Sequence, residues 1–155
     1  MIYLFTGQPG SGKTTLAKKL QFWLQTEKRN WRKSVLHIDG DKLRELFPNK
    51  DYSKEGREKN IQKAFDIAKY LDSEGVDVVI SLVSPYRNLR EGLKSECKVV
   101  EIYCHTRKMR GREDKFALDY EPPIQFFVDL DTSDSVDVTF TKLIKMLVWY
   151  TYSYN

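Results

Sequence analysis

Residues 7–14 read GQPGSGKT, and this stretch matches the pattern GxxxxGK[ST] at every defined position. Its glycines allow the chain to wrap so that successive backbone N–H groups point at phosphate oxygens. A short apolar run of strand type, Ile2–Thr6, precedes it, and an amphipathic helical pattern follows it. The stretch therefore predicts a phosphate-binding loop, here called the P-loop, between a buried strand and the N-terminus of a helix.

Two side chains of the P-loop bring chemistry of their own. Lys13 is expected to reach the β- and γ-phosphates of ATP, and the hydroxyl of Thr14 is expected to bind Mg²⁺. The alternative is a chance glycine-rich turn, and the strand and helix on its two sides argue against that. The predicted ATP-binding residues are Gly7, Gly10, Ser11, Gly12, Lys13, Thr14 and Thr15. The pattern leaves the acceptor of the phosphate open.

Beyond the P-loop, apolar runs of strand type alternate with helical patterns. Strands are expected at 2–6, 34–39, 76–83, 98–104 and 125–130, and helices at about 16–30, 42–46, 53–75, 87–94 and 133–148. This alternation predicts an α/β protein with the three-layer P-loop NTPase fold, a mainly parallel five-stranded sheet with helices on both faces. We expect one domain over residues 1–155, because no linker or repeat interrupts the pattern.

Several helix ends also have sequence signals. Ser53 is predicted to cap the long central helix, and Ser133 or Asp134 the last one, whose apolar face would run from Val136 to Val148. Trp31 is interpreted as packing at the end of the first helix. The terminal aromatic residues are compatible either with a covered sheet edge or with a contact in a homodimer.

Two carboxylates, Asp39 and Asp41, follow the second predicted strand with a glycine between them. Ligands of open α/β sheets bind at the carboxyl ends of the strands, so both acids are expected near the γ-phosphate. One could hold the water shell of Mg²⁺ while the other accepts the proton of an acceptor hydroxyl. A helix N-cap is the structural alternative, and one aspartate can serve both purposes.

Composition limits the classes of function. The chain has 155 residues, 41% hydrophobic and 31% charged, with a net charge of +4, which is typical of a soluble domain that binds small anions. Cys97 and Cys104 lack any ligand-like spacing and are predicted to be reduced. No apolar stretch approaches the roughly 18–20 residues that span a bilayer. We therefore expect a cytoplasmic protein with neither membrane nor nucleic-acid partners.

Further motifs resemble one family in particular. HIDGDKLR (37–44), YSKEGREKNI (52–61), SLVSPYRNLRE (81–91) and FALDYEPP (116–123) follow the P-loop in the order found in adenylylsulfate kinases (APS kinases). The resemblance implies transfer of the ATP γ-phosphate to the 3′-hydroxyl of adenosine 5′-phosphosulfate, with Mg²⁺ as cofactor. The small-molecule partners would then be ATP and adenosine 5′-phosphosulfate.

The same resemblance implies roles for individual residues. Lys13, Asp39 and Asp41 would be catalytic, with Thr14 and Asp39 at the metal and Asp41 at the acceptor hydroxyl. Arg44, Arg57 and Asn60 resemble the residues that hold the phosphosulfate. The loop under the acceptor nucleotide would comprise Ser84, Pro85, Tyr86 and Arg87, and Phe116 resembles the aromatic residue that stacks on its adenine.

The segment at about 106–123 is predicted to be a lid over the site. It is shorter than is usual in APS kinases, which carry a longer Lys-rich stretch where this chain has HTRKMRGREDK, with Arg107, Arg110 and Arg112 as candidate partners of the transferred phosphate. Three interpretations therefore stay open: an APS kinase, another small-molecule, nucleotide or polynucleotide 5′-hydroxyl kinase, and a non-catalytic ATP-binding module.

Overall fold

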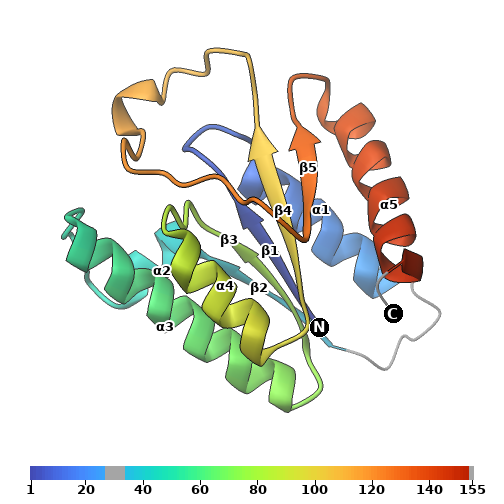
Figure 1. Ribbon diagram of the computed structural model, residues 1–155, viewed down its shortest axis with the longest axis horizontal. Helices are drawn as coiled ribbons and strands as arrows, with labels where there is room; N and C mark the ends of the chain where they lie inside the picture. The colour runs from blue at the N-terminus through green and yellow to red at the C-terminus, as the bar shows by residue number, and fades with distance from the viewer. Residues whose placement is uncertain (27–33, 154–155) are drawn as a thin grey trace.

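Five parallel strands form one sheet in a computed structural model that describes residues 1–26 and 34–153, with side chains up to Tyr150 (Figure 1). The position of Trp31 lies outside the described residues. The strand order is β2-β3-β1-β4-β5. The strands are β1 (Ile2–Thr6), β2 (Val35–Asp39), β3 (Asp77–Ser81), β4 (Val99–His105) and β5 (Phe127–Asp131). The predicted fold class is confirmed.

Helices cover both faces of the sheet (Figure 1). One face is covered by α1 (Lys13–Thr26) and α5 (Val136–Ser153). The other is covered by α2 (Gly40–Leu46), α3 (Lys54–Ser73) and α4 (Arg87–Glu96). A short 3₁₀ helix, η1 (Glu113–Lys115), lies in the connection between β4 and β5. Among the described residues, no helix is long and apolar enough to cross a membrane.

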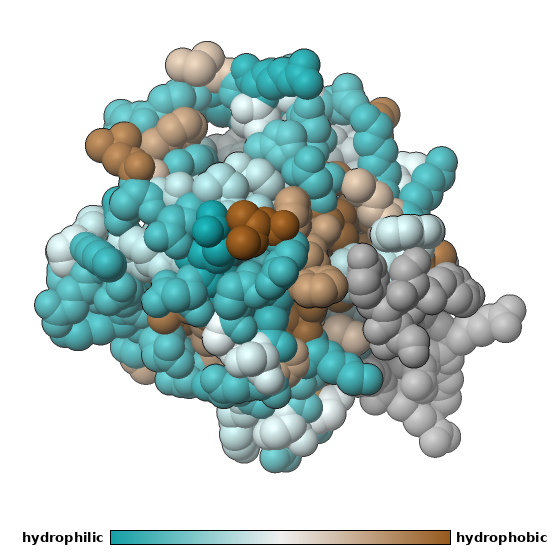
Figure 2. All heavy atoms as spheres, in the orientation of Figure 1, coloured by the Kyte–Doolittle hydropathy of each residue, from teal (hydrophilic) through white to brown (hydrophobic). Residues whose placement is uncertain are grey.

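Successive side chains of the central strand β1 point to opposite faces of the sheet, so the core has two layers. Tyr3 and Phe5 of β1 pack with α1 and α5, whereas Ile2 and Leu4 pack with α3 and α4. Burying one side chain of this size contributes roughly 1.5–3 kcal/mol, so both layers stabilise β1 in the middle of the sheet. Figure 2 shows that the face of the molecule turned to the viewer is mostly hydrophilic, with apolar residues in small separate groups.

The predicted strands and helices are present, but some of their ends differ from the predicted residues. Ser53 caps α3 as predicted, since its hydroxyl accepts from the backbone N–H of Gly56. The cap predicted for α5 was wrong: the helix starts after Ser135, whose hydroxyl accepts from Val138. Ser133 is engaged elsewhere, because its hydroxyl accepts from the backbone N–H of Arg107.

The far end of α5 also differs from the prediction. The helix continues to Ser153, whereas the sequence after Trp149 shows no clear period. Its buried face is narrower than predicted, because Leu143 and Leu147 are buried while Val136 and Val148 are exposed. The fifth strand starts at Phe127 rather than at residue 125.

Parallel strands place their carboxyl ends at one edge of the sheet. The P-loop follows β1 there, and the turn with Asp39 and Asp41, here called the acidic turn, follows β2. Residues 82–86, here called the Ser84 loop, follow β3, and the connection of residues 106–126 follows β4. Figure 1 shows this connection swinging out beyond the strand ends. Four of the predicted site segments therefore meet at one edge.

Candidate active site

The backbone of the P-loop depends on glycine. Gly7, Gly10 and Gly12 have φ angles of +138°, +80° and +85°, in the region that L side chains rarely adopt. A Cβ atom at Gly7 would lie 2.1 Å from the carbonyl oxygen of Cys104 in β4. The start of the loop is thus packed directly against the neighbouring strand, and only glycine fits there.

Lys13 lies buried in this loop. Its Nζ donates to the carbonyl oxygen of Gln8 at 2.7 Å and to the hydroxyl of Ser11 at 3.4 Å. Burial lowers the pKa of Lys13 to about 8, although the charges of Asp41 and Asp39 raise it. Within the described part of the chain no carboxylate accepts from this ammonium group, so its charge is available to a phosphate.

A polar network connects the P-loop to the acidic turn. The hydroxyl of Thr14 donates to Asp39 Oδ2 at 3.0 Å, and Ser81 Oγ donates to the same oxygen at 3.2 Å. His37 Nε2 lies 2.8 Å from Ser81 Oγ. Thr14 and Asp39, the two predicted metal ligands, are thus brought together by residues of β2 and β3.

Asp39 also caps α2, which is the structural alternative that the sequence offered for this residue. Its Oδ1 accepts from the backbone N–H groups of Asp41 and Lys42 at 3.0 and 3.2 Å. Partial burial would raise the pKa of Asp39, but the hydrogen bonds from Lys42, Thr14 and Asp41 outweigh it and hold the pKa below its usual value. Asp39 is therefore a stable anion at neutral pH, whereas Asp41 is exposed in the first turn of α2.

The predicted acceptor residues lie on α2, α3 and the Ser84 loop. Asn60 is buried on α3, while Arg57, one turn earlier, pairs with Asp119 at 3.2 Å. Arg44 does not share that contact: its Nη1 donates to the carbonyl oxygens of Asn49 and Asp51 at 3.1 and 3.0 Å. The guanidinium of Arg44 is therefore held by the loop between α2 and α3.

The Ser84 loop joins the connection of residues 106–126. Ser84, Pro85 and Tyr86 are buried, and the carbonyl oxygen of Pro85 accepts from the backbone N–H of Glu121 at 2.9 Å. Arg87 starts α4 and donates from its backbone N–H to Glu121 Oε2 and from its Nε to the carbonyl oxygen of Pro122, at 2.8 and 2.9 Å.

Residues 116–122, here called the lid stem, are fixed to the P-loop strand as well. Gln8 Nε2 donates to the carbonyl oxygen of Ala117, and the N–H of Ala117 donates to Gln8 Oε1, both at 2.9 Å. The hydroxyl of Tyr120 lies 2.8 Å from Thr6 Oγ1. Phe116 adjoins this clamp and is 37% exposed, so its ring remains available to a ligand.

Residues 107–115, here called the lid tip, have fewer attachments. Arg110 donates from Nη1 to the carbonyl oxygen of Gly10 at 3.0 Å and from Nη2 to that of Thr132 at 2.6 Å. Arg107 and Arg112 are exposed. The charged tip therefore lies beside the P-loop, with Arg110 already against it.

Comparison with known proteins shows which family has this sequence and fold. Residues 1–118 match the family described as adenylylsulphate kinase. The chain belongs to the adenylylsulphate kinase family. The match ends within the lid stem, so β5 and α5 lie outside the matched part of this family member.

Curated relatives extend the comparison. A probable adenylyl-sulfate kinase of Pyrococcus abyssi is 40% identical over 102 residues, which cover 64% of this chain and 56% of that protein. An adenylyl-sulfate kinase of Chloroflexus aurantiacus is 32% identical over 85% of this chain and 80% of its own length. A cytidine diphosphoramidate kinase of Campylobacter jejuni is 28% identical over 91% of this chain and 80% of its own.

A solved structure shares the fold of this adenylylsulphate kinase family member. The Mycobacterium tuberculosis APS kinase in complex with AMPPNP and APS superposes with a TM-score of 0.78 and 23% identity, over 94% of this chain and 96% of that one. At this identity the likeness concerns the fold alone.

Three residues of the site were missed by sequence reasoning. Gln8 occupies an undefined position of the P-loop pattern, and Tyr120 gave no signal beyond its place in FALDYEPP. Arg90 is the second arginine of the motif SPYRNLR, received no role in the sequence analysis, and is fully buried. A charged residue within the apolar run KVVEIYC, Glu101, was the available signal for a buried partner.

Proposed function

We propose that this chain is an ATP-dependent kinase that phosphorylates the 3′-hydroxyl of adenosine 5′-phosphosulfate. One observation carries the proposal: the Thr14–Asp39 hydrogen bond joins the phosphate-binding loop to the acidic turn at the strand edge where the Ser84 loop also lies. Family membership supports the nature of the acceptor.

The phosphates of ATP would lie against the backbone N–H groups of the P-loop and the N-terminus of α1. Lys13 would exchange its hydrogen bond to Gln8 for one to the β- and γ-phosphates, and its charge would stabilise the transferred phosphoryl group. Arg110 in the lid tip also lies against the P-loop, and its charge would add to that of Lys13.

The donor set at Thr14 and Asp39 fits Mg²⁺, because a hydroxyl and an ionised carboxylate lie 3.0 Å apart at the end of the phosphate loop. When bound, Mg²⁺ would neutralise charge on the β- and γ-phosphate oxygens. Asp39 would hold it directly or through water, since its low pKa keeps it ionised.

Asp41 is the better candidate for the general base. Asp39 already accepts four hydrogen bonds, which hold its negative charge and weaken it as a base, whereas Asp41 is exposed on the same turn. Asp41 would orient the 3′-hydroxyl and accept its proton as the bond to phosphorus forms.

Arg57, Asn60 and Phe116 would bind the acceptor. A guanidinium fork suits phosphate and sulfate oxygens, and an aromatic face suits a purine. Arg57 would exchange Asp119 for the acceptor's anionic group. The half-exposed ring of Phe116 beside the lid stem would stack on the base.

A second candidate acceptor is another nucleoside 5′-anhydride, with cytosine in place of adenine. The Campylobacter jejuni cytidine diphosphoramidate kinase aligns with 91% of this chain, across the lid stem, which supports considering this class. The phosphate chemistry would be the same, and the stack on Phe116 would decide between the bases.

We further infer a cytoplasmic enzyme, because its donor substrate ATP is available there. A homodimer through α5 is supported by the exposed apolar side chains of Val138, Met146 and Val148.

The test is ADP release from Mg-ATP by the purified protein. Adenosine 5′-phosphosulfate, cytidine diphosphoramidate, AMP, deoxynucleoside monophosphates and a 5′-hydroxyl oligonucleotide would be compared as acceptors, with Lys13→Ala as the inactive control. Release that depends on adenosine 5′-phosphosulfate supports the proposal. Release with another acceptor alone moves the specificity to that compound, and no release from protein that binds ATP identifies a binding module.

A further inference from the structure

Arg90 is an arginine with no exposed surface, on the inner side of α4. A buried guanidinium is costly unless its charge is paired and its donors are satisfied. Here the counter-charge is Glu101 of β4, which is equally buried and accepts from Arg90 Nε at 2.7 Å. The remaining donors of the fork are free to bind other groups, and they bind main-chain atoms of the acceptor site.

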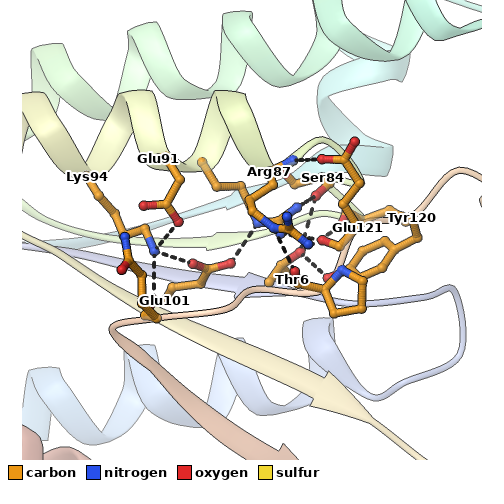
Figure 3. Close-up of polar contacts among 12 residues, drawn as sticks. Thr6, Ser84, Arg87, Glu91, Lys94, Glu101, Tyr120 and Glu121 are labelled. Atoms are coloured by element: carbon orange, nitrogen blue, oxygen red, sulfur yellow. Dashed lines mark hydrogen bonds and ion pairs between the residues drawn. The ribbon is translucent and has the colours of Figure 1, made fainter.

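Two carbonyl oxygens receive these donors. Nη1 donates to the carbonyl of Ser84 and Nη2 to that of Glu121, both at 2.5 Å. Figure 3 shows Ser84 and Glu121 on one side of this polar network and Glu101 on the other. One rigid side chain thus joins the Ser84 loop, the lid stem and the sheet.

The Ser84 loop needs such support. Ser84 has φ +44°, in the left-handed region that a residue with a Cβ rarely adopts, and its buried hydroxyl has no partner within the described part of the chain. A backbone held in this conformation persists only when its surroundings fix it. The charged donor on its carbonyl oxygen supplies that constraint.

The lid stem is located by the same residue. Arg90 holds the carbonyl of Glu121, and its guanidinium lies 5.6 Å from the ring centre of Tyr120, whose hydroxyl meets Thr6 of β1. Phe116, the proposed base platform, is four residues before Tyr120 in this stem. Arg90 is therefore one of the contacts that hold the stem relative to the P-loop strand.

We propose that Arg90 is a positioning residue for the acceptor: it fixes the Ser84 loop and the lid stem at the right separation before either substrate binds. It touches neither ATP nor the acceptor. The inference rests on the proposed function, because it assigns the acceptor to the space between these two segments. Loss of the fork would impair acceptor use and leave nucleotide binding intact.

Lys94 offers a matched control in the same buried cluster. Its Nζ pairs with Glu101 Oε2 at 2.8 Å and with Glu91 at 2.7 Å, and it donates to the carbonyl of Gln125 at 3.3 Å. Figure 3 shows it on the side of Glu101 away from Ser84. Lys94 thus shares the charge cluster without binding the Ser84 loop or the lid stem.

The experiment compares Arg90→Lys, the double variant Arg90→Met/Glu101→Leu, and Lys94→Met with the wild type. Arg90→Lys keeps a charge for Glu101 and loses the planar fork, whereas the double variant removes the buried ion pair without leaving an unpaired charge. In both, kcat/KM for the acceptor is expected to fall about 10- to 100-fold, with KM for Mg-ATP within about twofold of the wild type. Lys94→Met is expected to lower the melting temperature without this loss.

Acceptor kinetics of Arg90→Lys that match the wild type, or an equal loss in Lys94→Met, would overturn the proposal. A second readout needs no acceptor: amide hydrogen exchange at Arg87 and Glu121 should accelerate in both Arg90 variants while the P-loop stays unchanged. If the wild type phosphorylates no nucleotide acceptor, the proposed function fails by itself. Hydrogen exchange then decides whether Arg90 positions these segments, and unchanged exchange would refute it.

Discussion

Lys13 should make nucleotide affinity and protein stability respond to pH in opposite directions. In the ligand-free protein burial lowers its pKa to about 8, from 10.5 in an exposed lysine. Bound phosphates favour the charged form, so binding above pH 8 must first return a proton to Lys13. At pH 9, about one unit above this pKa, affinity should be about tenfold weaker than at pH 7, or ~1.4 kcal/mol.

Stability of the ligand-free protein should change the other way. Between pH 8 and 10.5 the unfolded chain holds a proton on Lys13 that the folded chain has released. Stability rises with pH wherever the unfolded state binds more protons, so this group adds stability across that window, up to roughly 3 kcal/mol. Burial raises the pKa of the adjacent Cys104 to about 12, so its thiol does not titrate in the same range.

Isothermal titration calorimetry with Mg-AMPPNP measures the effect. Runs at pH 7 and pH 9, in two buffers of different ionisation enthalpy, count the protons taken up, and at pH 9 about 0.9 proton per nucleotide is expected. The Lys13→Met variant should bind weakly at both pH values without this uptake. Equal affinity and no uptake at pH 9 in the wild type would refute the reasoning.

Three further variants test other parts of the site by steady-state kinetics. Asp41→Asn should lower kcat about 10²- to 10⁴-fold with unchanged KM for Mg-ATP, because the proton acceptor is lost, and wild-type turnover would reject that role. Phe116→Ala should raise KM for the acceptor about tenfold, and an unaltered KM would argue against base stacking. Gln8→Ala should raise KM for the acceptor several-fold and cost about 1–3 kcal/mol of stability, because both hydrogen bonds to Ala117 are lost. A Gln8→Ala protein with the stability of the wild type would mean that this clamp contributes nothing.

The fold followed from patterns that depend on neighbours in the sequence. Short continuous apolar runs indicated the strands and helical apolar patterns indicated the helices, and the P-loop residues indicated the order of strand, loop and helix. The P-loop, the acidic turn and the Ser84 loop lie at one edge of the sheet, because parallel strands end there, whereas Arg44 is held by the loop between α2 and α3. Their roles stay predictions until the variants are measured.

The cap of α5 and the burial of Arg90 were not predicted, because both depend on contacts between segments that are distant in the sequence. Ser133 or Asp134 was the predicted cap of α5, but the hydroxyl of Ser133 accepts from Arg107 after β4 and the hydroxyl of Ser135 accepts from Val138. Arg90 reads as a surface cation of a helix until Glu101, 11 residues later, is seen beneath it. The position of Glu101 within an apolar run signals a buried charge, but a single sequence does not say which cation pairs with it.

The way the lid stem is fixed has a consequence for how this family can diversify. Gln8 clamps the backbone of Ala117, Arg90 binds the carbonyl of Glu121, and Arg87 binds the carbonyl of Pro122. Because these anchors recognise main-chain atoms, the side chain at Phe116 can be exchanged without detaching the stem. If Phe116 carries the proposed stack, substitutions there would change the preferred base while the P-loop and its phosphate contacts stay the same.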